Sequence, residues 1–194
     1  MDGGGRFEYG RAEMALGATV YHFSIELSDV DRATYEVLDL RLARHPSESV
    51  RYLLTRTLAY CLSYEDGISF SKGGLGASED PPISIVSPTG TLRAWIDVGA
   101  PSARRLHKAS KAAERVSLFT HVERSLLLAE AASSPIHRLE EIEVWPLEVA
   151  FLDRVAARLD RKLSFTLTRS DGTLYLGLGG ETFETGLVSS RLVS

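Results

Sequence analysis

Residues 92–101, Leu-Arg-Ala-Trp-Ile-Asp-Val-Gly-Ala-Pro, constrain the fold more than any other stretch of the chain. Apolar and aromatic residues lead to a single acid, Asp97; Gly99 then interrupts the run, and Pro101 suits the first turn of a helix. The pattern predicts a central strand that carries a carboxylate to its own end, beside a helix start. Ligands of open α/β sheets bind at such strand ends, which makes Asp97 a candidate site residue. The alternative is a strand whose last polar side chain merely meets solvent.

The composition is that of an ordinary soluble globular protein. The chain has 194 residues, 44 % hydrophobic and 25 % charged, which suffices for one domain with a sizeable core. Its net charge of −4 gives no overall positive field, so binding of a polyanion would need a local basic patch. Cys61 is the only cysteine, which excludes an intrachain disulfide and a cysteine-based zinc cluster and favours a reducing compartment.

We expect a cytoplasmic protein that does not enter a membrane. Residues 1–5 lack the basic start and apolar block of a signal peptide, and no apolar run approaches the roughly 20 residues that span a bilayer. The Gly-rich residues 1–13 are predicted to form a flexible N-terminal extension. Residues 14–178 are expected to form a single globular domain, and residues 179–194 a C-terminal tail with weak strand character at best.

Alternating and helical patterns divide the domain into strands and helices. Residues 18–27 and 35–42 alternate and are joined by a short polar turn, which predicts an antiparallel pair. A helix is expected to start around His45-Pro46-Ser47-Glu48, with Ser47 as its cap and Glu48 in its first turn. Further strands are predicted at residues 83–86, 91–98, 116–119, 142–145, 163–168 and 173–178, and further helices at residues 101–113, at residues 121–132 and from Pro146.

This order of elements predicts an α/β (α+β) fold. Strands in antiparallel order come first, and strands alternating with helices follow, which argues for a mixed β-sheet flanked by helices. Cys61 falls on the apolar face of the first predicted helix and is expected to pack in the core. The polar, Gly- and Pro-rich residues 64–82 form a long loop, and such loops are usually functional or mobile.

Several common catalytic patterns are missing from the sequence. In the loop, Lys72 precedes its glycines and no Gly-Lys-Ser/Thr follows, so a phosphate-binding loop is not predicted, although Lys72 can still reach a site from there. The histidines have no metal-ligand spacing. A Gly-x-Ser-x-Gly elbow is also absent, which argues against a serine hydrolase of that type.

The acids support a metal-dependent hypothesis. Glu48 lies at a helix start, Asp80 precedes a pair of strands and Asp97 lies near a strand end, so the carboxylates can converge on a hard cation such as Mg²⁺, or Mn²⁺ in its place. A phosphodiester bound there would be open to attack by metal-activated water, with a nearby lysine stabilising the developing charge.

One cluster of basic residues supports a different hypothesis. Arg104, Arg105, Lys108, Lys111 and Arg115 follow one another within a predicted helix and just after it. On a helix, Arg104, Lys108 and Lys111 share a face because they are four and three residues apart. That face suits phosphates; the alternative is an ordinary solvated helix exterior.

Several motifs resemble those of the YaeQ family of bacterial proteins. The resemblance runs from about residue 14 to residue 178 and is more specific in the first half of the chain. It rests on Leu-Arg-Leu-Ala-Arg-His-Pro-Ser-Glu-Ser at residues 40–49, Met-Ala-Leu-Gly-Ala-Thr-Val-Tyr at residues 14–21, Asp-Val-Asp-Arg at residues 29–32, Phe-Ser-Lys-Gly at residues 70–73, Trp-Ile-Asp-Val-Gly at residues 95–99 and Arg-Leu-His-Lys-Ala at residues 105–109.

The resemblance implies a variant of the restriction-endonuclease-like fold of PD-(D/E)xK type. Asp97 would correspond to the (D/E) of that motif, and Glu48 to the acid contributed by the first core helix. The lysine position two residues after Asp97 is Gly99, so Lys108 or Lys72 would have to replace that lysine. Relatives tend to carry an acid where this chain has Pro82, a departure that weakens the case for a metal.

Two hypotheses follow for the function. The first is a Mg²⁺-dependent, nuclease-like phosphodiesterase, with Glu48, Asp80 and Asp97 holding the metal and Lys108 or Lys72 as the catalytic lysine. The second is a non-catalytic module on the same fold that binds nucleic acid or another protein through Arg104, Arg105, Lys108 and Lys111. The sequence does not choose between them, and it predicts no oligomeric state.

Overall fold

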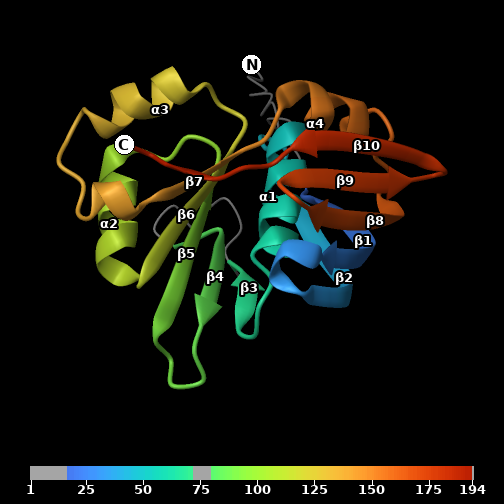
Figure 1. The fold of residues 1–194 in the computed structure, drawn as a ribbon, viewed down its shortest axis with the longest axis horizontal. Coiled ribbons are helices and arrows are strands. Elements are labelled where there is room, and N and C mark those ends of the chain that lie inside the picture. The colour runs from blue at the N-terminus through green and yellow to red at the C-terminus, as the bar shows by residue number, and fades with distance from the viewer. Residues whose placement is uncertain (1–16, 72–79, 194) are drawn as a thin grey trace, which may run out of the picture.

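The computed structural model of the protein describes residues 17–71 and 80–193. Its strands form a five-stranded and a six-stranded sheet, with helices between the two and on the far side of the larger one (Figure 1). The fold is therefore α+β, as predicted, but its strands are divided between two mixed sheets. The predicted extension at residues 1–13 and the candidate residue Lys72 lie outside the described residues.

The five-stranded sheet has the order β10-β9-β8-β1-β2. Strands β1 and β2 form the predicted antiparallel pair, and β1 also pairs with β8 in parallel. Asp171 and Gly172, both with positive φ, make a tight turn between β8 and β9. The strands are β1 (Thr19–Asp29), β2 (Thr34–Arg44), β8 (Lys162–Ser170), β9 (Thr173–Leu178) and β10 (Glu181–Gly186).

The six-stranded sheet has the order β11-β7-β6-β5-β4-β3. Strands β5, β6 and β7 are mutually parallel, so their carboxyl ends meet at one edge of the sheet. The strands are β3 (Ile68–Phe70), β4 (Ile83–Val86), β5 (Leu92–Val98), β6 (Arg115–Thr120), β7 (Glu143–Pro146) and β11 (Ser190–Arg191).

The helices fill the space between the sheets and cover the six-stranded one (Figure 1). Helices α1 (Val50–Leu62) and α4 (Val149–Ala156) share one apolar core with both sheets. Helices α2 (Ala103–Ala112) and α3 (Arg124–Ala131) share a second core with the other face of β5, β6 and β7. Short 3-10 helices occur at η1 (Val30–Arg32) and η3 (Leu139–Glu141).

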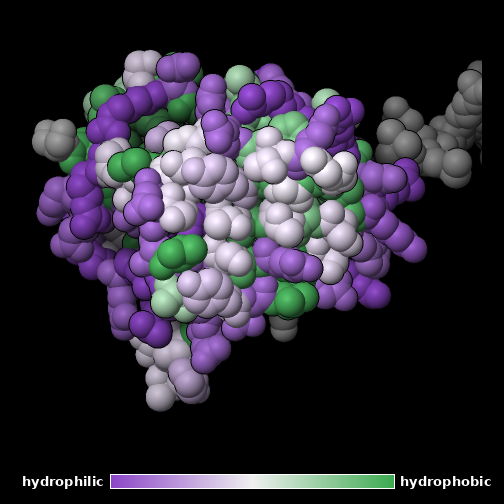
Figure 2. Space-filling view, turned by 45° about the vertical axis from the view of Figure 1, so that its right-hand side comes forward, coloured by the Kyte–Doolittle hydropathy of each residue, from purple (hydrophilic) through white to green (hydrophobic). Residues whose placement is uncertain are grey.

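The five-stranded sheet has a face that no helix covers in the described chain. Residues on that face alternate with the buried ones along each strand and include many serines and threonines. Figure 2 turns the side with β8, β9 and β10 forward and shows pale and green groups framed by hydrophilic ones. Among the described residues, no helix is long and apolar enough to cross a membrane.

Most predicted elements are present, and their burial follows the predicted patterns. Strands β4 and β9 have the predicted bounds. Helix α2 buries Leu106 and Ala109, and Cys61 lies fully inside the core as expected. Desolvation there raises the pKa of its thiol to about 12.

Several helix starts differ from the prediction. The cap of α1 is Ser49, whose hydroxyl accepts a hydrogen bond from the Tyr52 N–H at 3.1 Å, so the assignment of that role to Ser47 is wrong and Glu48 lies before the helix. Pro101 precedes the α2 cap, Ser102. Pro146 ends β7 instead of starting α4.

Some strands were not predicted. The loop at residues 64–82 contains the short strand β3, which has only three residues and therefore no readable alternation. The segment expected to be at most weakly strand-like contains β10, which extends the smaller sheet, and β11, which extends the larger one. Residues 181–191 thus contribute to both sheets.

Candidate functional site

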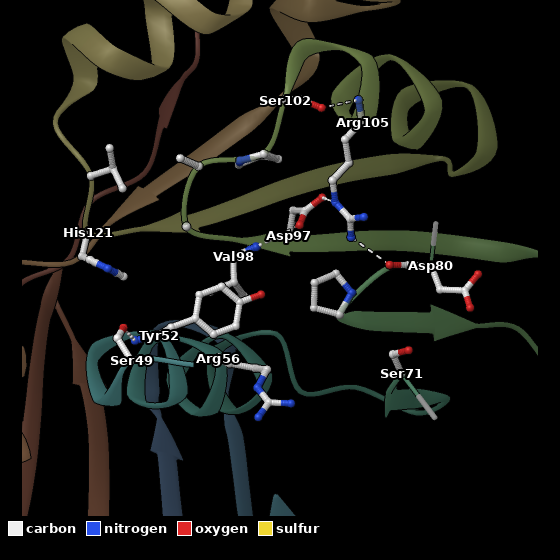
Figure 3. Close-up of a pocket in the computed structure, with 15 residues that line it drawn as sticks. Ser49, Tyr52, Arg56, Ser71, Asp80, Asp97, Val98, Ser102, Arg105 and His121 are labelled. Carbon is white, nitrogen blue, oxygen red and sulfur yellow. Dashed lines mark hydrogen bonds and ion pairs between the residues drawn. The ribbon is translucent and has the colours of Figure 1, made fainter. Parts of the chain in front are cut away.

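A cavity of about 460 Å³ lies where the carboxyl ends of β5 and β6 meet the first turns of α1 and α2 (Figure 3). Because parallel strands end at the same edge, the fold delivers Asp97 from β5 and His121 from the residue after β6 to one place. Among the described residues the lining consists of Ser49, Tyr52, Arg56, Ser71, Asp80, Pro82, Asp97, Val98, Gly99, Ala100, Pro101, Ser102, Arg105, His121 and Val122.

Asp97 is the most buried acid of this cavity, with 2 % of its surface exposed. Its Oδ2 accepts hydrogen bonds from Trp95 Nε1 at 3.0 Å and from Arg105 Nε at 2.7 Å, and its Oδ1 accepts one from the Val98 N–H at 3.2 Å. The Arg105 guanidinium also lies over the Trp95 ring, 5.4 Å from its centroid. The carboxylate is thus neutralised and held from several directions.

Arg105 connects the parts of the site. Its backbone N–H donates a hydrogen bond to the hydroxyl of Ser102, the α2 cap, at 3.3 Å. Its guanidinium donates to the Asp97 carboxylate and, at 2.8 Å, to the Asp80 carbonyl oxygen. The Arg105 side chain therefore joins helix α2 to strand β5 and to Asp80, in the segment that precedes β4. Figure 3 shows this chain of contacts across the cavity wall.

Gly99 has a conformation that explains why no lysine follows Asp97 there. Its φ is +83°, a left-handed value that glycine adopts freely and other residues rarely do. A Cβ at this position would lie 3.5 Å from the Tyr52 ring. A lysine would therefore be strained here by the backbone conformation.

Glu48 lies outside the cavity lining and pairs with Arg56, which is part of that lining. The carboxylate of Glu48, which is 3 % exposed, pairs with Arg56 Nη2 at 3.0 Å and accepts a hydrogen bond from the His45 N–H at 3.2 Å. Desolvation raises the pKa of Glu48, and the attraction of Arg56 offsets only part of that rise. The Arg56 Nε is buried without a hydrogen bond within the described chain, while its Nη2 also donates to the Ala43 carbonyl.

Two further polar side chains of the cavity, Tyr52 and His121, have shifted pKa values that favour their neutral forms. Desolvation, reinforced by the negative charge of Asp97, raises the pKa of Tyr52 to about 12, so its hydroxyl keeps its proton. Desolvation and the nearby Arg51 lower the pKa of His121, whose Nδ1 lies 3.1 Å from the Thr55 hydroxyl. In Figure 3 the Tyr52 hydroxyl points into the cavity.

The acids predicted to hold Mg²⁺ are not gathered around one point. Asp80 and Asp97 both line the cavity, but the Asp80 carboxylate points away from Asp97 (Figure 3), and Glu48 is not part of the lining. Within residues 17–71 and 80–193, no three acidic, histidine or cysteine side chains are grouped as a cation site. As they stand, these acids fit a divalent cation poorly, because Asp97 and Glu48 are already paired with arginines.

The predicted basic surface separates into parts. Arg104, Lys108 and Lys111 are exposed on α2 and share one face, as their spacing predicts. Arg105 turns toward Asp97 instead. Arg115, beyond the helix, pairs with Glu65 at 2.8 Å.

Tyr52 and Arg56 line the cavity but were not among the residues predicted from the sequence. Arg56 follows Glu48 by eight residues and Tyr52 follows it by four, so helical spacing from Glu48 was an available signal for both. Glu48 itself lies just outside the helix, which weakened that signal.

Taken together, these features define an α+β protein with a ligand-sized cavity at the carboxyl ends of parallel strands, bordered by arginines and helix starts. A family description, "YaeQ protein", matches residues 14–187. The chain belongs to the YaeQ family, in agreement with the resemblance seen in its motifs.

Individual relatives agree in length and in fold. The chain is 30 % identical over 177 residues to the uncharacterized protein YaeQ of Escherichia coli strain K12, covering 91 % of this chain and 97 % of that one. The crystal structure of the YaeQ protein from Pseudomonas syringae has a TM-score of 0.78 at 27 % identity, covering 88 % and 94 % of the two chains. That of the Xanthomonas axonopodis pv. citri protein has the same TM-score at 25 % identity, covering 90 % and 98 %.

Proposed function

We propose that the protein is a nucleic-acid-binding module that does not depend on a metal. In this proposal α2 presents Arg104, Lys108 and Lys111 to backbone phosphates, and the cavity at its first turn accepts one phosphate group. The observation that carries the proposal is the pairing of two of the predicted metal-binding acids with arginines, Asp97 with Arg105 and Glu48 with Arg56. This pairing cancels the negative charge that would repel a phosphate.

The surroundings of the cavity favour an anion over a cation. The caps of α1 and α2, Ser49 and Ser102, both line it, and the first turn of a helix has backbone N–H groups and a partial positive charge to offer an anion. Arg56 adds a guanidinium whose Nε lacks a hydrogen bond in the described chain. A phosphate oxygen is an acceptor of the kind these donors require.

The basic face of α2 is better suited to nucleic acid than to a protein partner. Protein interfaces are built around apolar and aromatic side chains, and none of the large exposed apolar residues of the described chain lies on α2. With a net charge of −4 for the whole chain, attraction to phosphates must come from this local face, so binding should weaken steeply with salt.

Charge reversal on α2 tests the proposal. The double variant Lys108→Glu/Lys111→Glu should lose affinity for labelled single-stranded DNA and RNA by roughly tenfold or more at low salt, as measured by fluorescence anisotropy. The matched control Arg161→Glu/Lys162→Glu changes the net charge equally at exposed residues near the start of β8 and should bind like the wild type. Equal binding by wild type and the α2 variant, or loss in both variants, contradicts the proposal.

A Mg²⁺-dependent phosphodiesterase is the second candidate. One observation favours it: Asp80 and Asp97 line the same cavity, next to the helix that carries Lys108. A cation bound there would have to draw Asp97 away from Arg105. Calorimetric titration with Mg²⁺ and with Mn²⁺ separates the candidates, because saturable binding lost in Asp97→Asn supports this one, and no binding by the wild type argues against it.

A further inference from the structure

Strand β2 is the exposed edge of the five-stranded sheet. It pairs with β1 along its whole length, Thr34 to Arg44, without a bulge, and within the described chain no strand occupies its other side (Figure 1). A long, regular edge strand is a template for pairing with another strand unless charges, prolines or bulges protect it. Residues 34–44 contain no proline and no lysine.

The outward side chains of β2 are unusually apolar for a solvent-facing strand. Val37 is 75 % exposed and Tyr35 is 60 % exposed, and on the neighbouring β1 Val20 is exposed as well. The charged residues on the same outward side, Asp39 and Arg41, are of opposite sign and two residues apart. Charged side chains on an edge strand disfavour pairing with an unrelated strand. Two opposite charges at this spacing nevertheless allow the strand to pair with a second copy of itself, because each charge can then lie opposite its counterpart.

Two copies of β2 are complementary when they pair antiparallel about a two-fold axis at Leu40. In that register Asp39 of each copy lies opposite Arg41 of the other, and Val37 lies opposite Ala43. Antiparallel partners directly opposite each other interact, and opposite charges there are favourable. Because all of these partners are an even number of residues apart, outward side chains stay outward and Leu38 faces Leu42 on the core side.

The neighbouring registers are not complementary. An axis at Asp39 places two aspartates directly opposite each other, and an axis at Arg41 places two arginines opposite each other, both of which are destabilising. Shifting the pairing register by an odd number of residues would place core-side residues of one copy on the outer face of the other. The register at Leu40 is therefore selected by charge and by face together.

The same register joins exposed apolar residues across the sheet. On β1, Val20 lies opposite Ala43, so the second copy's Val37 extends that row to Val20, Ala43 and Val37. The Ala43 carbonyl already accepts a hydrogen bond from Arg56 at 3.0 Å, so we expect the new backbone ladder to be centred on the Asp39–Arg41 pairs and to end near Ala43.

We infer that a second copy of this chain docks on β2, in antiparallel register about Leu40, to form a homodimer with one continuous sheet across both copies. The interface is isologous, since each copy supplies the same strand. Its residues neither line the cavity nor belong to α2, so the inference does not rest on the proposed nucleic-acid binding.

Complementary charge variants test the dimer in solution. By size-exclusion chromatography with light scattering, the wild type should have twice the 21.3 kDa of one chain. Asp39→Arg and Arg41→Asp each place like charges opposite each other at both pairs, which should raise the dimer dissociation constant by roughly tenfold or more. A one-to-one mixture of the two variants should again be dimeric, because the two arginines of the first variant then lie opposite the two aspartates of the second.

Two further variants serve as controls. Ser164→Arg, an exposed change on β8 of the same sheet, should stay dimeric. Val37→Lys should weaken the dimer by placing a charge opposite Ala43 while Asp39 and Arg41 stay unchanged, and circular dichroism checks that each variant is folded. A monomeric wild type, a dimer unaffected by Asp39→Arg and Arg41→Asp, or a mixture that fails to associate would each overturn the inference.

Discussion

Two buried carboxylates of this protein are each held by an arginine from a nearby helix: Asp97 by Arg105 and Glu48 by Arg56. Burying a lone carboxylate costs several kcal/mol, so such groups need a partner with good geometry. The pairing differs between the two: Asp97 accepts bonds on both oxygens, whereas Glu48 Oε1 has an ion-pair contact but no well-formed hydrogen bond. Asp97 is therefore the more firmly fixed of the two acids.

His121 makes stability depend on pH at the residue scale. Its pKa is lowered from 6.5 in the folded state, first by desolvation and then by Arg51. At pH values between the pKa of His121 in the folded chain and its pKa in the unfolded chain, the unfolded chain binds more protons. The free energy of unfolding should therefore fall as pH drops below 6.5. Replacing His121 by Asn should shrink the difference in urea midpoint between about pH 8 and about pH 5.

The comparison with the wild type isolates this effect. Glu48, whose pKa is raised above 4.5 in the folded state, acts in the opposite direction. As pH rises from its unfolded-state pKa through its folded-state pKa, its contribution to the free energy of unfolding is lost. Its contribution is the same in both proteins and cancels. His137→Asn, at an exposed histidine, is the control and should retain the wild-type pH dependence. An unchanged pH dependence in His121→Asn would exclude His121 as the cause.

At the scale of elements, the turn that begins β3 depends on one glycine. Gly67 has a φ of +88°, and a Cβ built there would lie 2.1 Å from the Val86 carbonyl oxygen. Gly90 has the same φ but no atom within 4 Å of such a Cβ. The two glycines therefore separate the strain of a left-handed backbone from a clash with a neighbouring strand.

Alanine at each position should have a different effect on stability. Gly90→Ala should lower the free energy of unfolding by about 1–2 kcal/mol, the usual cost of a left-handed residue. Gly67→Ala should lower it by roughly 3 kcal/mol or more, because strain and displacement of β4 add. Urea denaturation of both variants gives the comparison. Equal losses would mean that β3 and β4 separate without cost at Gly67.

The longest strands were predicted because their residues alternate, whereas the two shortest strands and β10, whose burial does not alternate, were missed. Strands β1, β2 and β9 repeat every second residue over six or more positions, whereas β3 has three residues and β11 has two. The division into two sheets was not predictable, because alternation reports which face is buried and not which strand lies alongside. The candidate site also has a predictable and an unpredictable part. The position of Asp97 at a strand end was readable from the sequence, whereas its pairing with Arg105 depends on how α2 packs.

For the whole molecule, the C-terminal segment joins the two sheets. Strand β10 belongs to the smaller sheet and β11 to the larger one. Between them and after them, Leu187 is buried in the core around α1 and Leu192 in the core around α2. Residues of β5 and β6 face both cores, so disruption of either core should destabilise the other.

Leu192→Ala and Leu187→Ala should therefore each lower the free energy of unfolding of the whole protein. A large-to-small change in a core costs about 2–5 kcal/mol, and we expect it to move a single transition, since both cores share the six-stranded sheet. Val188→Ala, at a side chain 69 % exposed, is the matched control and should have little effect. Urea denaturation followed by tryptophan fluorescence measures this, because Trp95 lies in one core and Trp145 packs against the other. If Leu192→Ala instead produced a separate early transition, the cores would be independent cooperative units.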